Sequence, residues 1–198
     1  VITIDFKPEF AVEPLDVELG AFVLGDSGEP KDTKGILSRV KESVLDAVQL
    51  LRRKEGGFSL ASAASGRFSR AESGLAHSQI GLLDGTIRNR DITSEARALL
   101  KKKPLDHRCL GELLSAHHTV LRDVLGISTT KIDRMLDAAA GAGAYGGKIN
   151  GSGGGGCMFA YAPVNPESVA EAVARAGGKP HIVRVDTGTR RDAGDAAA

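Results

Sequence analysis

The stretch KINGSGGGGCMFAYAP, which runs from Lys148 to Pro163, decides how this chain must fold. Its six small residues from Gly151 to Gly156 stand directly before an apolar run that is typical of a strand. Glycine loses more backbone freedom on folding than any other residue, so such a run indicates a special requirement. That requirement is positive φ, or a ligand or backbone that approaches closer than a Cβ atom allows. Phosphate groups are common ligands of this kind.

Two well-known phosphate-binding patterns fail on their context. Gly151, Gly153 and Gly156 match GxGxxG, but the dinucleotide-binding motif has a helix after the loop, and here a strand follows. The Walker loop requires Lys and Ser or Thr after its last glycine, where Cys157 and Met158 stand. What remains is a glycine loop between two strands. A helix precedes it, because apolar residues repeat at helical spacing: Ile132, Met135, Leu136 and Ala139.

The composition excludes several function classes. The chain has 198 residues, and its 26 basic and 25 acidic residues give a net charge of +1, which predicts neither a nucleic acid nor a membrane surface as partner. No apolar run is long enough to span a bilayer, and no signal peptide is recognisable, so we expect a cytoplasmic protein. Cys109 and Cys157 are interpreted as packed thiols. No metal-ligand spacing is present, and we predict no metal site.

Strands are predicted near both ends of the chain, with helices between them. The predicted strands are VITIDF, GAFVLGD, the two that flank the glycine loop, and HIVRVD; the predicted helices cover about 33–54, 76–103, 107–126, 128–146 and 166–176. Ser128 is expected to cap the fourth helix. This order predicts an α+β fold, an antiparallel sheet with helices packed on one side. We expect one domain over residues 1–186 and a disordered tail over 187–198.

The segment GAYGGKINGSGGGGCMFAYAP, after a helix, resembles the third signature motif of the GHMP kinases, which include galactokinase, homoserine kinase and mevalonate kinase. Upstream, LGELLSAHHTVLRDVLGISTTKID is similar to the galactokinase type, in which a His and then Leu-Arg-Asp precede that motif. Those positions are His118, Leu121, Arg122 and Asp123. The resemblance covers about Val1 to Asp186 and implies the ferredoxin-like C-terminal domain of the family.

The resemblance implies transfer of the γ-phosphoryl group of ATP, with Mg²⁺, to an alcohol on a small metabolite. The family's nucleotide-phosphate loop, of the type PxGxGLxSSA, is absent; SLASAASG lacks its proline and Gly-x-Gly. By this alignment the catalytic Asp and that loop lie upstream of Val1, and no catalytic residue is expected within the chain. We therefore expect the C-terminal half of a kinase, inactive alone, whose partner is the missing N-terminal kinase domain.

The candidate site residues lie in the glycine loop, beside it in the sequence, and at the end of a predicted strand. The backbone N–H groups of the loop could bind phosphate oxygens or pack against the missing nucleotide loop. The predicted cofactor-binding residues are Gly151, Ser152, Gly153, Gly154, Gly155 and Gly156. Asp26 and Ser27, at a strand end, and Asn150 are the predicted substrate contacts, with a simple turn as the alternative for the first two. His117 is interpreted as a core residue, and Arg122 and Asp123 as surface charges.

Three functions remain open from the sequence. A sugar is the first choice of acceptor, from the His and Leu-Arg-Asp segment, although GILSRVKESVLDAV lacks the tyrosine that galactokinases usually carry there, which weakens galactose itself. Mevalonate is the alternative acceptor. The third reading is a non-catalytic binding or interaction module built on the same fold.

Overall fold

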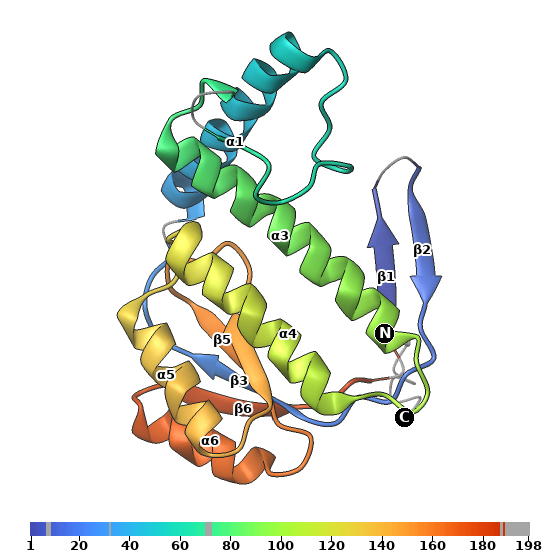
Figure 1. The fold of residues 1–198 in the computed structure, drawn as a ribbon. Helices are drawn as coiled ribbons and strands as arrows, with labels where there is room; N and C mark the ends of the chain where they lie inside the picture. The colour runs from blue at the N-terminus through green and yellow to red at the C-terminus, as the bar shows by residue number, and fades with distance from the viewer. Residues whose placement is uncertain (7–8, 32, 70–72, 187, 189–198) are drawn as a thin grey trace, which may run out of the picture.

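The computed structural model of the chain describes residues 1–6, 9–31, 33–69, 73–186 and 188. Figure 1 shows a sheet with helices in the lower part, a second layer of helices above it, and a small hairpin beside them. The elements in chain order are β1 (Ile2–Asp5), β2 (Ala11–Pro14), β3 (Phe22–Asp26), α1 (Thr33–Glu55), α3 (His77–Leu100), α4 (His107–Thr119), the π-helical turn η1 (Val120–Val124), α5 (Thr130–Gly141), β4 (Gly146–Ile149), β5 (Cys157–Tyr161), α6 (Pro166–Arg175) and β6 (Lys179–Val183).

The main sheet has four antiparallel strands in the order β4-β5-β3-β6. With a helix before β4 and another before β6, this is the split β-α-β arrangement of ferredoxin-like folds. Helices α5 and α6 cover one face, where Met135, Val173 and Met158 are fully buried. The predicted α+β fold, with an antiparallel sheet and helices packed on one side, is confirmed.

Helix α4 lies along the free edge of β4. Their backbones approach so closely that a Cβ atom on Gly146 would lie 1.8 Å from the carbonyl oxygen of Gly111. Glycine at both positions therefore allows a helix to cover an edge strand that would otherwise present unpaired backbone groups.

Helices α1 and α3 form a second layer with its own core. The apolar stripe of α1, including Val44, Val48 and Leu51, packs against Leu83 and Ile87 of α3. The segment between the two helices also contributes to this core, because Phe58 and Ala63 are buried in it. The sequence predicts both helices, the first from its apolar stripe with helical period and the second as a helical stretch that ends before Pro104.

The first strand does not join the main sheet. Strand β1 pairs with β2 in a separate antiparallel hairpin, in which Thr3 lies opposite Glu13. The hairpin rests on the end of α3, where Arg97 Nη1 lies 2.8 Å from Asp5 and Nη2 lies 2.6 Å from Glu13. The alternation of VITIDF identified a strand but could not identify its partner, and β2 was not predicted.

Three smaller expectations need correction. The helix predicted over 107–126 is α-helical only to Thr119 and then π-helical. Thr129, not Ser128, caps α5, since its hydroxyl accepts from the N–H of Ile132 at 3.2 Å. The last strand covers Lys179–Val183 instead of 181–186.

The two cysteines are free thiols, as expected. Within the described ranges, no helix has both the length and the apolar composition that a membrane crossing requires. The tail predicted over 187–198 lies, apart from Gly188, outside the described residues, and so does Asp32.

Candidate functional site

The glycine loop joins β4 to β5, as the sequence predicts, and its backbone is almost entirely left-handed. Positive φ angles occur at Gly151 (75°), Gly153 (82°), Gly154 (72°), Gly155 (116°) and Gly156 (73°). Gly153 has a second constraint, because a Cβ atom there would lie 2.4 Å from the carbonyl oxygen of Ile127. Other residues rarely adopt these angles, so the run of glycine is a requirement of this backbone path.

Hydrogen bonds from two other segments fix the path of the loop. The N–H of Gly154 donates to the carbonyl of Ile127 at 2.8 Å, and the N–H of Gly156 donates to the carbonyl of Glu29 at 3.0 Å. The carbonyl of Gly156 accepts from the N–H of Ser27 at 2.8 Å. The loop is therefore held between the end of β3 and the segment before α5.

The predicted substrate contacts adjoin the loop, but two of them form a turn. The carboxylate of Asp26 accepts from the N–H of Gly28 at 2.9 Å, and the hydroxyl of Ser27 accepts from the N–H of Glu29 at 3.1 Å. Ser27 is buried, with 1% of its surface exposed. Both side chains thus shape the turn that positions Glu29. Asn150 is exposed at the start of the loop, and its carbonyl lies 3.5 Å from Lys31 Nζ.

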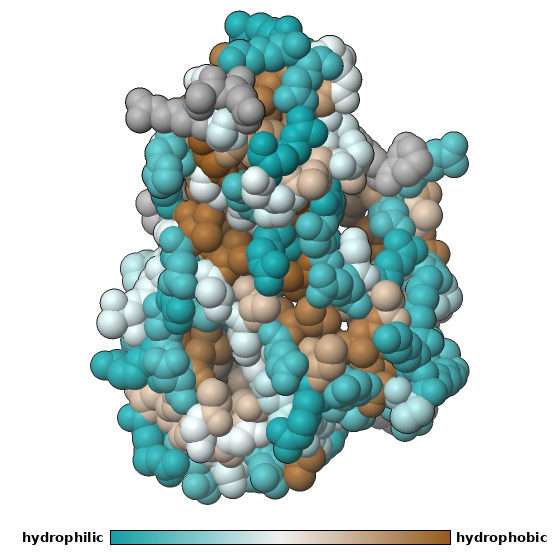
Figure 2. Space-filling view, in the orientation of Figure 1, coloured by the Kyte–Doolittle hydropathy of each residue, from teal (hydrophilic) through white to brown (hydrophobic). Residues whose placement is uncertain are grey.

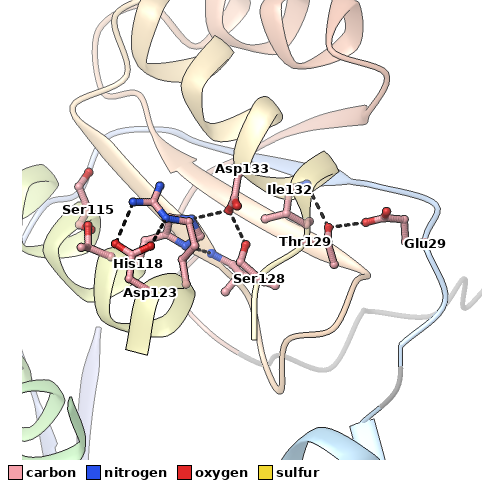
Figure 3. A network of polar contacts seen from close by, with 11 residues as sticks. Glu29, Ser115, His118, Asp123, Ser128, Thr129, Ile132 and Asp133 are labelled. Carbon is pink, nitrogen blue, oxygen red and sulfur yellow. Dashed lines mark hydrogen bonds and ion pairs between the residues drawn. The ribbon is translucent and has the colours of Figure 1, made fainter. Parts of the chain in front are cut away.

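A network of polar side chains lies behind the loop, between α4 and α5 (Figure 3). The Nε2 atom of His118 lies 3.1 Å from Asp133 Oδ1, which also accepts from the hydroxyl of Ser128 at 2.5 Å. The hydroxyl of Thr129 donates to the carboxylate of Glu29 at 2.6 Å. The network therefore joins α4, the start of α5 and the turn after β3.

Sequence reasoning missed most of this network. It did not select Glu29, Thr129 or Asp133, and it selected Ser128 only as a helix cap and not as a partner of Asp133. The Ser-Thr-Thr run before α5 is the one signal that could have pointed to it, because such residues bond locally at helix starts. Arg122 and Asp123 form an exposed ion pair with each other, as the surface interpretation expects.

Of the two adjacent histidines, the fully buried one is not the one that the sequence predicts. The apolar stripe predicted that His117 lies in the core, but His118 is the buried one, with 6% of its surface exposed, and His117 is half-buried. The reason is that α4 packs against the edge of β4 as well as against the neighbouring helices. Burial, and to a smaller extent the nearby Lys148 and His118, together lower the pKa of His117 to about 4.

Lys148 places a cation close to the loop, on β4. Its ammonium group donates to the carbonyl of Ile149 at 2.8 Å and lies 5.2 Å from the centre of the Phe159 ring. Burial lowers the pKa of Lys148. Among the described residues, no group of three or more His, Cys, Asp or Glu side chains is arranged to hold a metal ion.

The segment that contains the glycine loop matches a known protein family in sequence. Residues 96–179 match the family model for the C-terminal region of the GHMP kinases. This segment is a GHMP kinase C-terminal domain.

Sequence relatives of the GHMP kinase domain carry two different activities. A mevalonate kinase from Pyrococcus abyssi is 50% identical over 76 residues, which cover 38% of this chain and 22% of that enzyme. A galactokinase from Mycobacterium bovis is 38% identical over 72 residues, which cover 36% of this chain and 20% of that enzyme. The recognised family is thus confirmed, while the relatives differ in substrate.

The fold likeness extends over nearly the whole chain. A crystal structure of Lactococcus lactis galactokinase complexed with galactose superposes with a TM-score of 0.78 at 19% identity. The match covers 92% of this chain and 49% of that one, so the chain spans about half the length of the galactokinase. The fold likeness therefore extends well beyond residues 96–179, which the family model matches.

Proposed function

We propose that this chain supplies the C-terminal half of an ATP-dependent GHMP kinase that phosphorylates a hydroxyl group of a sugar. The observation that carries the proposal is the glycine loop, with five left-handed glycines held from two sides. Phosphoryl transfer depends on positioning and on electrostatic stabilisation of the transferring group, and preorganised backbone N–H groups supply both.

The loop offers part of its backbone to the phosphates of ATP. The N–H groups of Gly154 and Gly156 donate within the chain, so they serve to shape the loop. Of the other glycine amides of the loop, we assign that of Gly151 to phosphate, because Gly151 is exposed, whereas Gly153 and Gly155 are buried. The described residues offer no cluster of metal ligands, so Mg²⁺ would be held by the rest of the enzyme and the phosphates of ATP.

We assign the docking of the first half of the kinase to the hairpin. Its polar side chains face α3, and its apolar ones face outward: Ile2 (57% exposed), Ile4 (46%), Phe6 (75%), Phe10 (70%) and Val12 (49%). A contiguous apolar face of this kind marks an interaction surface. In Figure 2, which is seen from the same side as Figure 1, apolar surface also gathers between the α1–α3 layer and the α4–α5 layer. The catalytic Asp would come from that first half.

A sugar is our first choice of acceptor, and mevalonate is the second. The sugar assignment rests on the segment around His118, Leu121 and Arg122, which resembles the galactokinase type. The mevalonate alternative is favoured by the 50% identity to the Pyrococcus abyssi enzyme. A non-catalytic binding module is the alternative of another class, and a cytoplasmic location belongs to the proposal.

The test is a coupled assay of ATP consumption by the complete protein with galactose, other hexoses, sugar phosphates and mevalonate. We expect one class to dominate, because a site that hydrogen-bonds sugar hydroxyls leaves buried groups unpaired with another substrate, at a cost of about 10⁴-fold in kcat/KM. We expect hexoses to be preferred, and residues 1–198 alone to show no turnover. Preference for mevalonate would overturn the sugar assignment, and absence of turnover with every acceptor would favour the binding module.

A further inference from the structure

His118 makes contact with two segments through its two ring nitrogens. Its Nδ1 atom lies 3.3 Å from the backbone nitrogen of Ile149, and its Nε2 atom lies 3.1 Å from Asp133 Oδ1. Ile149 is the last residue of β4 and is buried. Asp133 lies in the first turn of α5. A single side chain of α4 therefore joins the strand that enters the glycine loop to the helix start behind it.

These contacts determine which tautomer is present. A backbone N–H can only donate, so Nδ1 must be an unprotonated acceptor. The proton then resides on Nε2, where it is donated to the carboxylate of Asp133. Strand β4 lies at the edge of the sheet, so the N–H of Ile149 has no neighbouring strand to bond to. The ring of His118 accepts this hydrogen bond instead, and no buried N–H is left unpaired there.

Charged groups around His118 come from three packed elements. Burial lowers the pKa of His118, Asp133 of α5 raises it, and Arg122 of η1 and Lys148 of β4 lower it. The largest cause favours the neutral ring, which agrees with the tautomer that the two contacts require.

Both segments that His118 joins also fix the loop. Ile149 leads through Asn150 into Gly151, and the carbonyl of Ile127, next to Ser128, accepts from the N–H of Gly154. Ser128 in turn donates to Asp133. The chain of contacts from Ile149 through His118, Asp133 and Ser128 to Ile127 thus begins at one side of the loop and ends at its middle. Figure 3 shows its central part, from His118 through Asp133 to Ser128.

We propose that His118 is a positioning residue of the glycine loop, which holds the exit of β4 and the start of α5 at a fixed separation through a neutral ring protonated on Nε2. It contacts no phosphate itself. Only the kinetic part of this inference rests on the proposed function.

Two conservative variants separate the two contacts. In His118→Asn the side-chain oxygen can take the place of Nδ1, whereas in His118→Gln the side-chain amide can take the place of Nε2. His118→Leu removes both contacts. His117→Asn is the matched control, because it changes the same residue type one position earlier on the same helix.

The first measurement is amide hydrogen exchange in residues 1–198, followed by NMR. We expect exchange at Ile149 to stay within about threefold in His118→Asn and to rise by about tenfold or more in His118→Gln and His118→Leu. Exchange at Gly154 should rise in every variant that loses the Asp133 contact. Ring ¹⁵N shifts should show the proton on Nε2. A proton on Nδ1, or exchange that rises equally at Ile149, Gly154 and Leu83, which lies in the separate core of α1 and α3, would overturn the proposal.

The second measurement is the KM for ATP of the complete protein. His118→Leu should raise this KM by about tenfold or more, while His117→Asn stays within about twofold. Equal effects of the two variants would contradict a positioning role. If the unsubstituted protein consumes no ATP with any acceptor, the proposed function fails, and the exchange measurement still decides the role of His118.

Discussion

The two sheets of this molecule are stabilised in opposite ways. The four-stranded sheet buries most of one face under α5 and α6, with Met135 and Met158 at 0% exposure. The two-stranded hairpin turns its polar side chains toward α3 and its apolar ones to solvent, and its ion pairs with Arg97 and Lys101 are partly exposed. Buried packing stabilises strongly, whereas exposed ion pairs contribute little. The four-stranded sheet is therefore the packed support of the glycine loop, and the hairpin is a surface that we assign to docking.

The largest expected effect is a core truncation in the main sheet region. Met135→Ala should lower the free energy of unfolding by about 2–5 kcal/mol, because it leaves a cavity between α5 and the sheet. Val12→Ala, on the outer face of the hairpin, should change it by less than about 0.5 kcal/mol. Denaturant unfolding of the two variants checks this. Similar losses for both would mean that the hairpin belongs to the same cooperative core.

A smaller, local effect is expected for Glu13. Hydrogen bonds from Lys101 and Arg97 lower the pKa of Glu13 from 4.5 to about 2. A lowered pKa means that the carboxylate stabilises the docked hairpin above pH 4.5 and that this contribution disappears as the pH falls toward 2. NMR of hairpin amides over this range should show release from α3 before the main sheet changes.

Variants of Glu13 sharpen the same test. Glu13→Gln should weaken the docking of the hairpin already at neutral pH, while Glu9→Gln, in the same hairpin, should behave like the unsubstituted chain. A hairpin that stays docked in Glu13→Gln would show that apolar contacts, and not these ion pairs, hold it.

The sequence predicted those parts of the fold in which local pattern and burial agree. The spacing of Ile132, Met135, Leu136 and Ala139 identified α5 because all four residues are buried on one side of it. The alternation of residues 1–6 predicted a strand, but strand partners are set by long-range packing that alternation does not encode.

The candidate site was predictable in its backbone and not in its side chains. The glycine run identified the loop, because few other backbone paths require such a run. That His118 and not His117 is the fully buried histidine could not be predicted, since it depends on α4 covering the edge of β4. The partners of Asp133 were missed for the same reason: they meet only when two distant segments pack together.

The central proposal is that backbone N–H groups of the glycine loop bind the phosphates of ATP. A pair of matched substitutions in the complete protein tests it most directly. Gly151 and Gly66 have φ angles of 75° and 74°, and Gly66 has no neighbour that an added Cβ would meet. Both Gly151→Ala and Gly66→Ala should therefore cost about 1–2 kcal/mol of stability through the backbone alone. We predict that kcat/KM for ATP falls by about tenfold or more in Gly151→Ala and stays within about twofold in Gly66→Ala. Equal kcat/KM values for the two variants would contradict the account.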